Sequence, residues 1–324
     1  MELTIDHIRD AADRLTGHAY RTPILTSEKL NDRVGAEVFF KAEIFQRLGA
    51  FKFRGAYNAV AGLSAEDRAK GFVAASSGNH GQALALAATM FGSKATILMP
   101  SDSPQTKIAA TRENGGEVIL YDRYRDNRDA LQAQVTEERG ALTISPFDHY
   151  GVMAGAGTVG LELIEQVPEL DELIIPISGG GLTSGCAIAV HSVNPKIEVW
   201  GAEPSVANDT QRSLASGVRE RQDTPRSIAD GLLVPTPGEL TFPVNQKHLA
   251  GVRTATDEDI VEAMRFLFTA MKIVVEPSGA IGLATLLNAP MREQSSRIGV
   301  ILTGGNVDLG RFCELLSSSG FPPY

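Results

Sequence analysis

The sequence predicts an α/β protein with mostly parallel sheets, and three observations lead to this fold class. Short β-branched apolar runs alternate with helical patterns almost to the end of the chain, which is typical of βαβ units. Glycine supplies 32 of the 324 residues and clusters directly after three of these runs. A chain of this length favours about two domains, and it can bury enough surface to fold without a disulfide or a metal.

Each expected strand is a short run of apolar residues with little polar alternation. Such runs indicate strands that are buried on both faces, as in parallel sheets covered by helices. The expected strands cover residues 38–41, 71–75, 95–99, 118–121, 173–177, 199–203 and 297–302.

The segments between these strands show helical periodicity or are rich in small residues. Near the N-terminus, Ile5, Ile8, Ala12 and Leu15 share one face, which predicts an amphipathic helix rather than a signal peptide. Segment 212–250 has few strand formers, and we expect it to be an irregular surface excursion. Further helices are expected at 81–90, 126–138, 152–166 and 257–271.

The charge and the cysteine content exclude several classes of protein. The net charge is −9 and no basic stripe is present, which argues against nucleic acid as a partner. Cys186 and Cys313 are too few for a disulfide framework or a thiolate metal cluster. No apolar stretch approaches the roughly 18–20 residues of a membrane span. We therefore expect a cytoplasmic protein that binds a small molecule and has no membrane partner.

Three glycine-rich segments directly follow expected strands: 76–81 (SSGNHG), 178–185 (SGGGLTSG) and 303–306 (TGGN). A single glycine cluster most often forms only a tight turn. In an open α/β sheet, however, ligands bind beyond the carboxyl ends of the strands, where such loops gather. The placement of the three segments therefore predicts ligand-binding loops.

The second glycine segment predicts a phosphate site. Gly179, Gly180 and Gly181 precede a helix start, where exposed backbone N–H groups and the helix dipole attract an anion. Cys186 stands where a Walker A loop requires lysine, and Ser184 occupies the last position of a GxGxxG pattern. The segment thus predicts a phosphate without requiring a nucleotide.

Lys52 lies between Phe51 and Phe53. Most lysines in such a setting extend their stem over apolar surface. An apolar flank also lowers the pKa of the amine by desolvation, as a Schiff-base lysine requires. A lysine of this kind together with a single-phosphate cradle points to pyridoxal phosphate.

Seven motifs resemble those of the serine/threonine dehydratase and serine racemase family of fold-type II pyridoxal phosphate enzymes, which includes 3-hydroxyaspartate dehydratases. In chain order they are AFKFRGA, SSGNHGQALA, PISGGGLTSG, AEPSVAND, SIADGL, VEPSGAIG and ILTGGNVD. The resemblance implies a tryptophan synthase β-like fold with two three-layer α/β/α domains and mostly parallel twisted sheets. Residues 1–54 and 149–324 would form a large cofactor domain and residues 55–148 a small domain, and the protein would be a homodimer.

The resemblance also implies the cofactor contacts. Lys52 would carry pyridoxal phosphate covalently and later move the substrate Cα proton. A hydroxyl at Thr303 would leave the pyridine ring a weaker electron sink than an aspartate would, which favours loss of a β-leaving group. The remaining contacts, to the ring, its hydroxyl, the phosphate and the pyridine nitrogen, would come from Phe51, Asn79, Gly179, Gly180, Gly181, Leu182 and Thr303.

The substrate contacts are implied in the same way. Ser77 is the second acid/base candidate, opposite the lysine, although a role in helix capping or carboxylate binding is equally consistent with its position. Arg128 would bind a second substrate carboxylate and so select 3-hydroxyaspartate, but a solvated helix start is the simpler interpretation of its arginine-rich surroundings. The loop for the substrate α-carboxylate would consist of Ser76, Ser77, Gly78, Asn79 and His80.

A divalent cation site is a further implication of the resemblance. The carboxylates of Glu203 and Asp209 and the carbonyl of Ala207 match the family's site. Hard oxygen ligands suit Mg²⁺, Ca²⁺ or Mn²⁺. Without the resemblance, these residues would be interpreted as solvated acids near a helix start.

The predicted function is that of a pyridoxal phosphate-dependent ammonia-lyase. It would convert L-threonine, L-serine or threo-3-hydroxyaspartate to a 2-oxo acid and ammonia by α,β-elimination. Ala50 and Ala156 replace polar residues usual in the family, which puts simple threonine specificity in doubt. The alternatives are a serine racemase with side dehydratase activity, a catalytically silent protein that binds pyridoxal phosphate or an amino acid, and a nicotinamide dehydrogenase.

Overall fold

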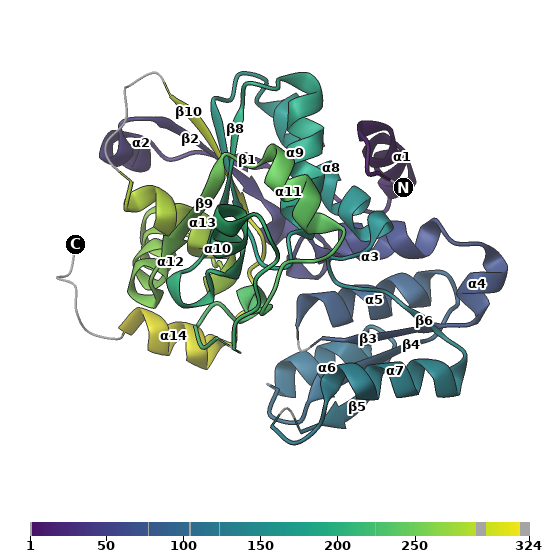
Figure 1. The fold of residues 1–324 in the computed structure, drawn as a ribbon. Coiled ribbons are helices and arrows are strands. Elements are labelled where there is room, and N and C mark those ends of the chain that lie inside the picture. Colours follow the sequence, from purple (N-terminus) through teal and green to yellow (C-terminus); the bar gives the residue numbers. More distant parts are fainter. Residues whose placement is uncertain are drawn as a thin grey trace.

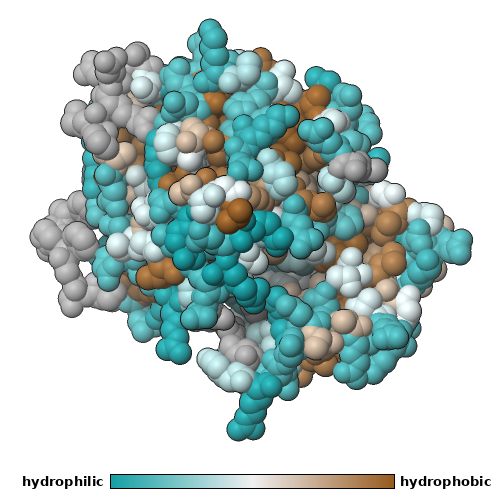
Figure 2. Space-filling model, viewed as in Figure 1, coloured by the Kyte–Doolittle hydropathy of each residue, from teal (hydrophilic) through white to brown (hydrophobic). Residues whose placement is uncertain are grey.

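The computed structural model describes residues 2–76, 78–103, 105–122, 124–223, 225–289 and 296–317. Two sheets organise these residues into two domains and confirm the predicted α/β class (Figure 1). In the space-filling view, a hollow opens on this face between the larger and the smaller part of the molecule (Figure 2). None of the helices in the described ranges is long and apolar enough to span a membrane.

The larger sheet has six strands in the order β1-β2-β10-β7-β8-β9. All of its neighbouring pairs are parallel except β1 with β2. Its strands are β1 (Ile24–Leu25), β2 (Glu37–Ala42), β7 (Glu172–Pro176), β8 (Glu198–Pro204), β9 (Gly251–Ala255) and β10 (Arg297–Leu302).

Successive residues of the central strands face opposite helical layers. Leu173 and Ile175 of β7 pack in the apolar cluster formed with α8 (Tyr150–Gln166) and α9 (Gly181–Val193). Ile174 packs instead with residues of α12 (Asp257–Met271) and α13 (Pro277–Leu287). Both faces of the sheet are therefore covered, which explains the uninterrupted apolar character of these strands.

The smaller sheet has four parallel strands in the order β5-β4-β3-β6. Val73 packs with Val135 of α7 (Arg128–Arg139), whereas Phe72 packs with α3 (Lys52–Ala61) and α5 (Asn79–Met90) on the other face. The strands are β3 (Phe72–Ala75), β4 (Ala95–Pro100), β5 (Gly116–Tyr121) and β6 (Leu142–Thr143).

Local signals set many helix ends. Asn127 caps α7 by accepting from the backbone of Asp129 and Ala130, and left-handed Gly140 ends it. Thr256 forms a capping box at the start of α12. The remaining helices are α1 (Ile5–Leu15), α2 (Glu28–Val34), α4 (Ala65–Ala69), α6 (Gln105–Glu113), α10 (Asp209–Ser216), α11 (Thr241–His248) and α14 (Leu309–Ser317), with short 3₁₀ turns at η1 (Glu43–Phe45), η2 (Arg47–Gly49), η3 (Ser205–Ala207) and η4 (Asp230–Leu232).

All seven predicted strands are confirmed with small differences at their ends, and the helix over 257–271 has the predicted bounds. The expectation of an irregular segment at 212–250 is wrong in part, because this segment contains α11. Pro243 lies in the first turn of α11, where a missing N–H costs no intrahelical bond. All four small-sheet strands lie between residues 72 and 143, and the domain limits at residues 54 and 149 stay a prediction.

Candidate active site

Loops from the two sheets meet at one place. The loop after β3 belongs to the small sheet, and the loop after β10 belongs to the large sheet. Asn79, at the start of α5, accepts at its Oδ1 from Asn306 Nδ2 at 2.8 Å. Its Nδ2 donates to Glu276 Oε1, also at 2.8 Å. Two of the three glycine-rich segments are thus in direct contact.

Lys52 is the first residue of α3 and lies beside the loop after β10. Phe51 N donates to Thr303 O at 3.0 Å, which ties the start of α3 to this loop. Lys52 Nζ donates to Pro146 O at 2.9 Å and lies 5.0 Å from the centre of the Phe51 ring. Burial lowers the pKa of Lys52 to about 8, against the opposing charge of Glu276. A sizeable fraction of the amine is therefore neutral and nucleophilic near pH 8.

The glycine loop after β7 has a shape that only glycine permits. Gly180 has a φ of +91° and precedes the first turn of α9. A Cβ on Gly179 would lie 2.3 Å from the Phe147 ring, and one on Gly181 would lie 2.8 Å from Phe147 O. The first-turn N–H groups of α9 have no partner within the helix. The loop is therefore a close-fitting cradle whose donors suit a phosphate.

Residues of α11 hold this cradle in place. Thr241 Oγ1 donates to Gly179 O at 2.5 Å, and Asn245 Nδ2 donates to Gly180 O at 3.3 Å. Ser184 Oγ also donates to Gly180 O, at 2.8 Å. All three side chains are fully buried. The sequence analysis missed Thr241 and Asn245, because their contacts join segments about 60 residues apart.

Glu276 is a second site residue that the sequence analysis missed. It is buried, and burial together with the nearby Asp230 raises the pKa of Glu276 to about 8. Its hydrogen bond to Asn79 fixes which end of the Asn79 amide donates. Glu276 directly precedes the apolar helix α13 and is the single acidic residue in segment 273–287. An acidic residue in such apolar surroundings was the available sequence signal.

The loop predicted to receive the substrate carboxylate is partly described. Ser76 Oγ accepts from the backbone N–H groups of Gly78 and Gly81 at 3.3 and 3.2 Å. His80 is buried, its Nε2 contacts Ile144 O at 3.1 Å, and burial lowers the pKa of His80 to about 3. This neutral ring carries its proton on Nε2 and anchors the loop. Ser77 lies outside the described residues.

Arg128 does not contact Lys52 but lines a nearby cavity of about 290 Å³. It is the first residue of α7, and its half-exposed guanidinium pairs with the adjacent Asp129 at 2.7 Å. Ser145 and Phe147 also line the cavity, and they flank Pro146, the partner of Lys52. The cavity is therefore lined by both chain neighbours of the residue that accepts from the reactive amine.

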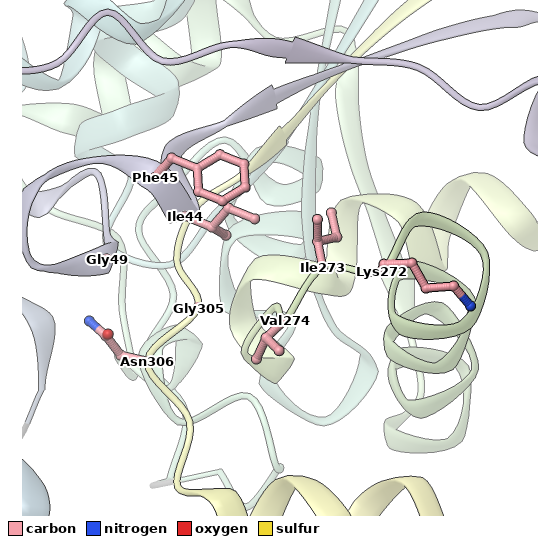
Figure 3. Close-up of a pocket in the computed structure, with 8 residues that line it drawn as sticks. All are labelled: Ile44, Phe45, Gly49, Lys272, Ile273, Val274, Gly305 and Asn306. Carbon is pink, nitrogen blue, oxygen red and sulfur yellow. The ribbon is translucent and has the colours of Figure 1, made fainter.

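A second cavity, of about 320 Å³, touches the site through Asn306 and Gly49 (Figure 3). Phe45, Ile44 and Val274 contribute apolar walls. The amine of Lys272 donates to Thr269 O at 2.5 Å and points away from the other labelled side chains in Figure 3. Among its lining residues, no charged side chain is directed into this cavity.

The three residues predicted to bind a cation lie around the end of β8. Glu203 and Asp209 are fully buried, and Ala207 is in η3 between them. Oε2 of Glu203 and Oδ2 of Asp209 have no hydrogen-bond partner within the described part of the chain. Burial raises the pKa of Glu203 to about 8 and that of Asp209 to about 7.

These two unpaired buried oxygens fit a hard divalent cation whose shell is completed by a carbonyl and water. The described residues contain no cluster of three or more His, Cys, Asp or Glu side chains that could hold a metal. The chain would therefore supply only two carboxylates to the ion.

The chain is similar to known proteins in both sequence and structure. Residues 15–304 match the family described as pyridoxal-phosphate dependent enzyme. The L-threo-3-hydroxyaspartate ammonia-lyase of Saccharomyces cerevisiae is 45% identical, covering 97% of this chain and 96% of the relative. The serine racemase of Schizosaccharomyces pombe is 43% identical, covering 97% of both chains. The structure of maize serine racemase superimposes with a TM-score of 0.92 at 42% identity, covering 97% of each chain.

Proposed function

The chain belongs to the pyridoxal-phosphate dependent enzyme family, and we propose that it is an ammonia-lyase acting on β-hydroxy amino acids. The substrate class comprises L-serine, L-threonine and threo-3-hydroxyaspartate. The observation that carries the proposal is the Lys52 amine, whose pKa burial lowers to about 8, in a site bordered by a glycine cradle and the Asn79 amide. Ammonia-lyases at 45% and 44% identity support the reaction class.

The cofactor fits the residues present. Lys52 would hold it covalently, Phe51 would pack on its ring, and Asn79 would meet its ring hydroxyl. Thr303 would face the pyridine nitrogen. When bound there, pyridoxal phosphate supplies the electron sink that acidifies the substrate Cα–H bond. The cradle for its phosphate would be formed by the backbone of Gly179, Gly180, Gly181 and Leu182.

Lys52 then performs the proton chemistry. The carbonyl of Pro146 accepts one amine hydrogen and so orients the nitrogen. The neutral amine takes the Cα proton, and the β-hydroxyl leaves as water. Hydrolysis of the resulting enamine gives the 2-oxo acid and ammonia.

Backbone groups of the 76–80 loop bind the substrate α-carboxylate in this proposal. His80 keeps the loop in place, because its neutral ring forms a hydrogen bond with Ile144 O. Glu276 and Asn306 orient Asn79 from the opposite domain. Substrate binding therefore engages groups from both sheets at once.

A serine racemase is the second candidate, favoured by the likeness to racemases at 42–43% identity. Racemisation needs an acid/base group opposite Lys52, and Ser77 is the proposed one. Ser77→Ala is expected to abolish interconversion of L- and D-serine while L-serine dehydration continues. Loss of racemisation and dehydration together would contradict a role of Ser77 in racemisation alone.

The proposed function is tested by measuring 2-oxo acid release from the three amino acids together with the absorbance of the bound cofactor. Lys52→Ala is expected to abolish both signals, whereas Lys70→Ala, which removes an exposed lysine, leaves both intact. A protein that shows cofactor absorbance but releases no 2-oxo acid from any substrate would instead be a silent binding protein.

We also propose that Glu203, Asp209 and the carbonyl of Ala207 bind Mg²⁺, Ca²⁺ or Mn²⁺. The unpaired oxygens of Glu203 and Asp209 support this site. A homodimeric state and a cytoplasmic location remain part of the proposal, and sedimentation of the purified protein tests the former.

A further inference from the structure

The walls of the cavity near Lys52 include one arginine that forms no ion pair with the other described wall residues. Three arginines line it, together with three acidic residues. Arg128 pairs with Asp129, and Arg219 pairs with Glu239 at 3.0 Å. The Asp148 carboxylate accepts from the backbone N–H groups of Glu239 and Leu240.

Arg221 is the remaining wall arginine. It is exposed, and within the described part of the chain it has no hydrogen bond or ion pair. Its neighbour Gln222 is held at both ends: Gln222 N donates to Pro235 O at 3.0 Å, and its side chain donates to Asp209 Oδ1 at 3.3 Å. The backbone next to Arg221 is therefore fixed while its guanidinium is free to bind an anion.

Two contacts link this cavity to the proposed active site. Ser145 and Phe147 flank the carbonyl that holds Lys52 Nζ. Gln132 accepts from Ala75 N, directly before the carboxylate loop. Arg128 lies four residues before Gln132 and so shares its face of α7. The cavity is thus linked to the reactive amine through the neighbours of Pro146, and to the start of the carboxylate loop through the face of α7 that carries Arg128 and Gln132.

We propose that Arg221 is a specificity-determining residue that binds a second carboxylate on the substrate side chain, opposite Arg128. The inference rests on the proposed function and narrows its substrate class to β-hydroxy amino acids that carry a side-chain carboxylate, as 3-hydroxyaspartate does. Arginine suits this role because its planar fork binds a carboxylate through two charge-assisted hydrogen bonds. The two arginines come from different domains, so a dicarboxylate would bridge the domains.

The test compares Arg221→Gln with Arg226→Gln, a matched change at an exposed arginine outside the cavity. In the holoenzyme, the ratio of kcat/KM for threo-3-hydroxyaspartate to that for L-serine is expected to fall about ten- to hundredfold in Arg221→Gln, mostly through KM. Arg226→Gln should leave the ratio within twofold of the wild type. An unchanged ratio in Arg221→Gln would overturn the inference.

A binding measurement separates this inference from the proposed function. Calorimetry with succinate and butyrate compares a dicarboxylate and a monocarboxylate of equal length. Arg221→Gln is expected to weaken succinate binding about tenfold or more and to reduce its advantage over butyrate. If no amino acid yields a 2-oxo acid but this advantage depends on Arg221, the proposed function fails and the carboxylate site stands. Equal binding of the two acids by the wild type would refute the site.

Discussion

Two groups of buried or largely buried carboxylates differ in how their charge is balanced. Glu43 and Glu162 surround Arg54, which donates to both oxygens of Glu43 at 2.8 Å and to those of Glu162 at 2.7 and 2.9 Å. Lys41 adds a contact to Glu162 at 2.7 Å. Glu162 is 17% exposed, whereas Glu203 and Asp209 are fully buried, yet each of the latter two has an oxygen without a partner in the described ranges.

The pKa values follow this difference. Burial alone would raise the pKa of Glu162, but Arg54 and Lys41 outweigh it and lower that pKa. Burial raises the pKa of Glu203 and of Asp209, and Arg212 offsets this rise only in part, at Asp209. The first group is a self-contained ionic cluster. In the second group, the proposed cation would supply the missing positive charge.

Removing Arg54 should produce the largest effect. Arg54→Leu leaves the buried Glu43 without its ion-pair partner and leaves Glu162 with Lys41 alone, and the free energy of unfolding is expected to fall by about 3–5 kcal/mol. Urea unfolding measures the change. Arg125→Leu, at an 86% exposed side chain, should change stability by less than about 0.5 kcal/mol. A loss below about 1 kcal/mol for Arg54→Leu would contradict the comparison.

Adding a divalent cation should have the next largest effect. At a concentration of 100 times its Kd, Ca²⁺ or Mg²⁺ is expected to raise the free energy of unfolding by about 2.7 kcal/mol. Thermal unfolding with the ion or with chelator measures the gain. Asp209→Asn should remove most of it, because one of the two proposed carboxylate ligands is lost. An equal gain in Asp209→Asn would assign the ion to another site.

The sequence could predict much of the fold and, of the two carboxylate groups, only the one that contains Glu203 and Asp209. The bounds of α12 follow from its helical period and the Thr256 capping box, both local features. β9 and α11 carry weak local signals and depend on neighbours distant in sequence. The partners of Arg54 lie 11 and 108 residues away, so its cluster could not be predicted. Arg221 was equally hidden, since its cavity joins four separate segments.

The stability of the cation-free protein should depend on pH through the second group of carboxylates. The folded protein keeps protons on Glu203 and Asp209 up to about pH 7–8, whereas the unfolded chain loses them near pH 4. The free energy of unfolding should therefore fall as pH rises from about 5 to 8 in chelator. Each proton that only the folded protein retains lowers the free energy of unfolding by about 2 kcal/mol over a rise of about 1.5 pH units.

Urea unfolding at pH 5.5 and 7 measures this slope. The double variant Glu203→Gln/Asp209→Asn has no such protons and should show a smaller fall. Saturating Ca²⁺ should likewise flatten the slope, because the ion holds both carboxylates as anions. A slope that is the same in the wild type and the double variant would show that other groups cause it.

The smallest effect is expected at an exposed pair with the same geometry as the Arg54 cluster. Arg139 binds both oxygens of Glu117, one of them at 2.7 Å, but the two side chains are 38% and 55% exposed. Water already solvates these charges, so a double-mutant cycle with Arg139→Gln and Glu117→Gln should give about 0.2–1 kcal/mol. The pair should weaken further in high salt. A coupling energy above about 2 kcal/mol would mean that hydrogen-bond geometry, rather than burial, determines how much such an ion pair contributes to stability. The contrast between the Arg54 cluster and the Glu203 group could then not be explained by burial and charge balance.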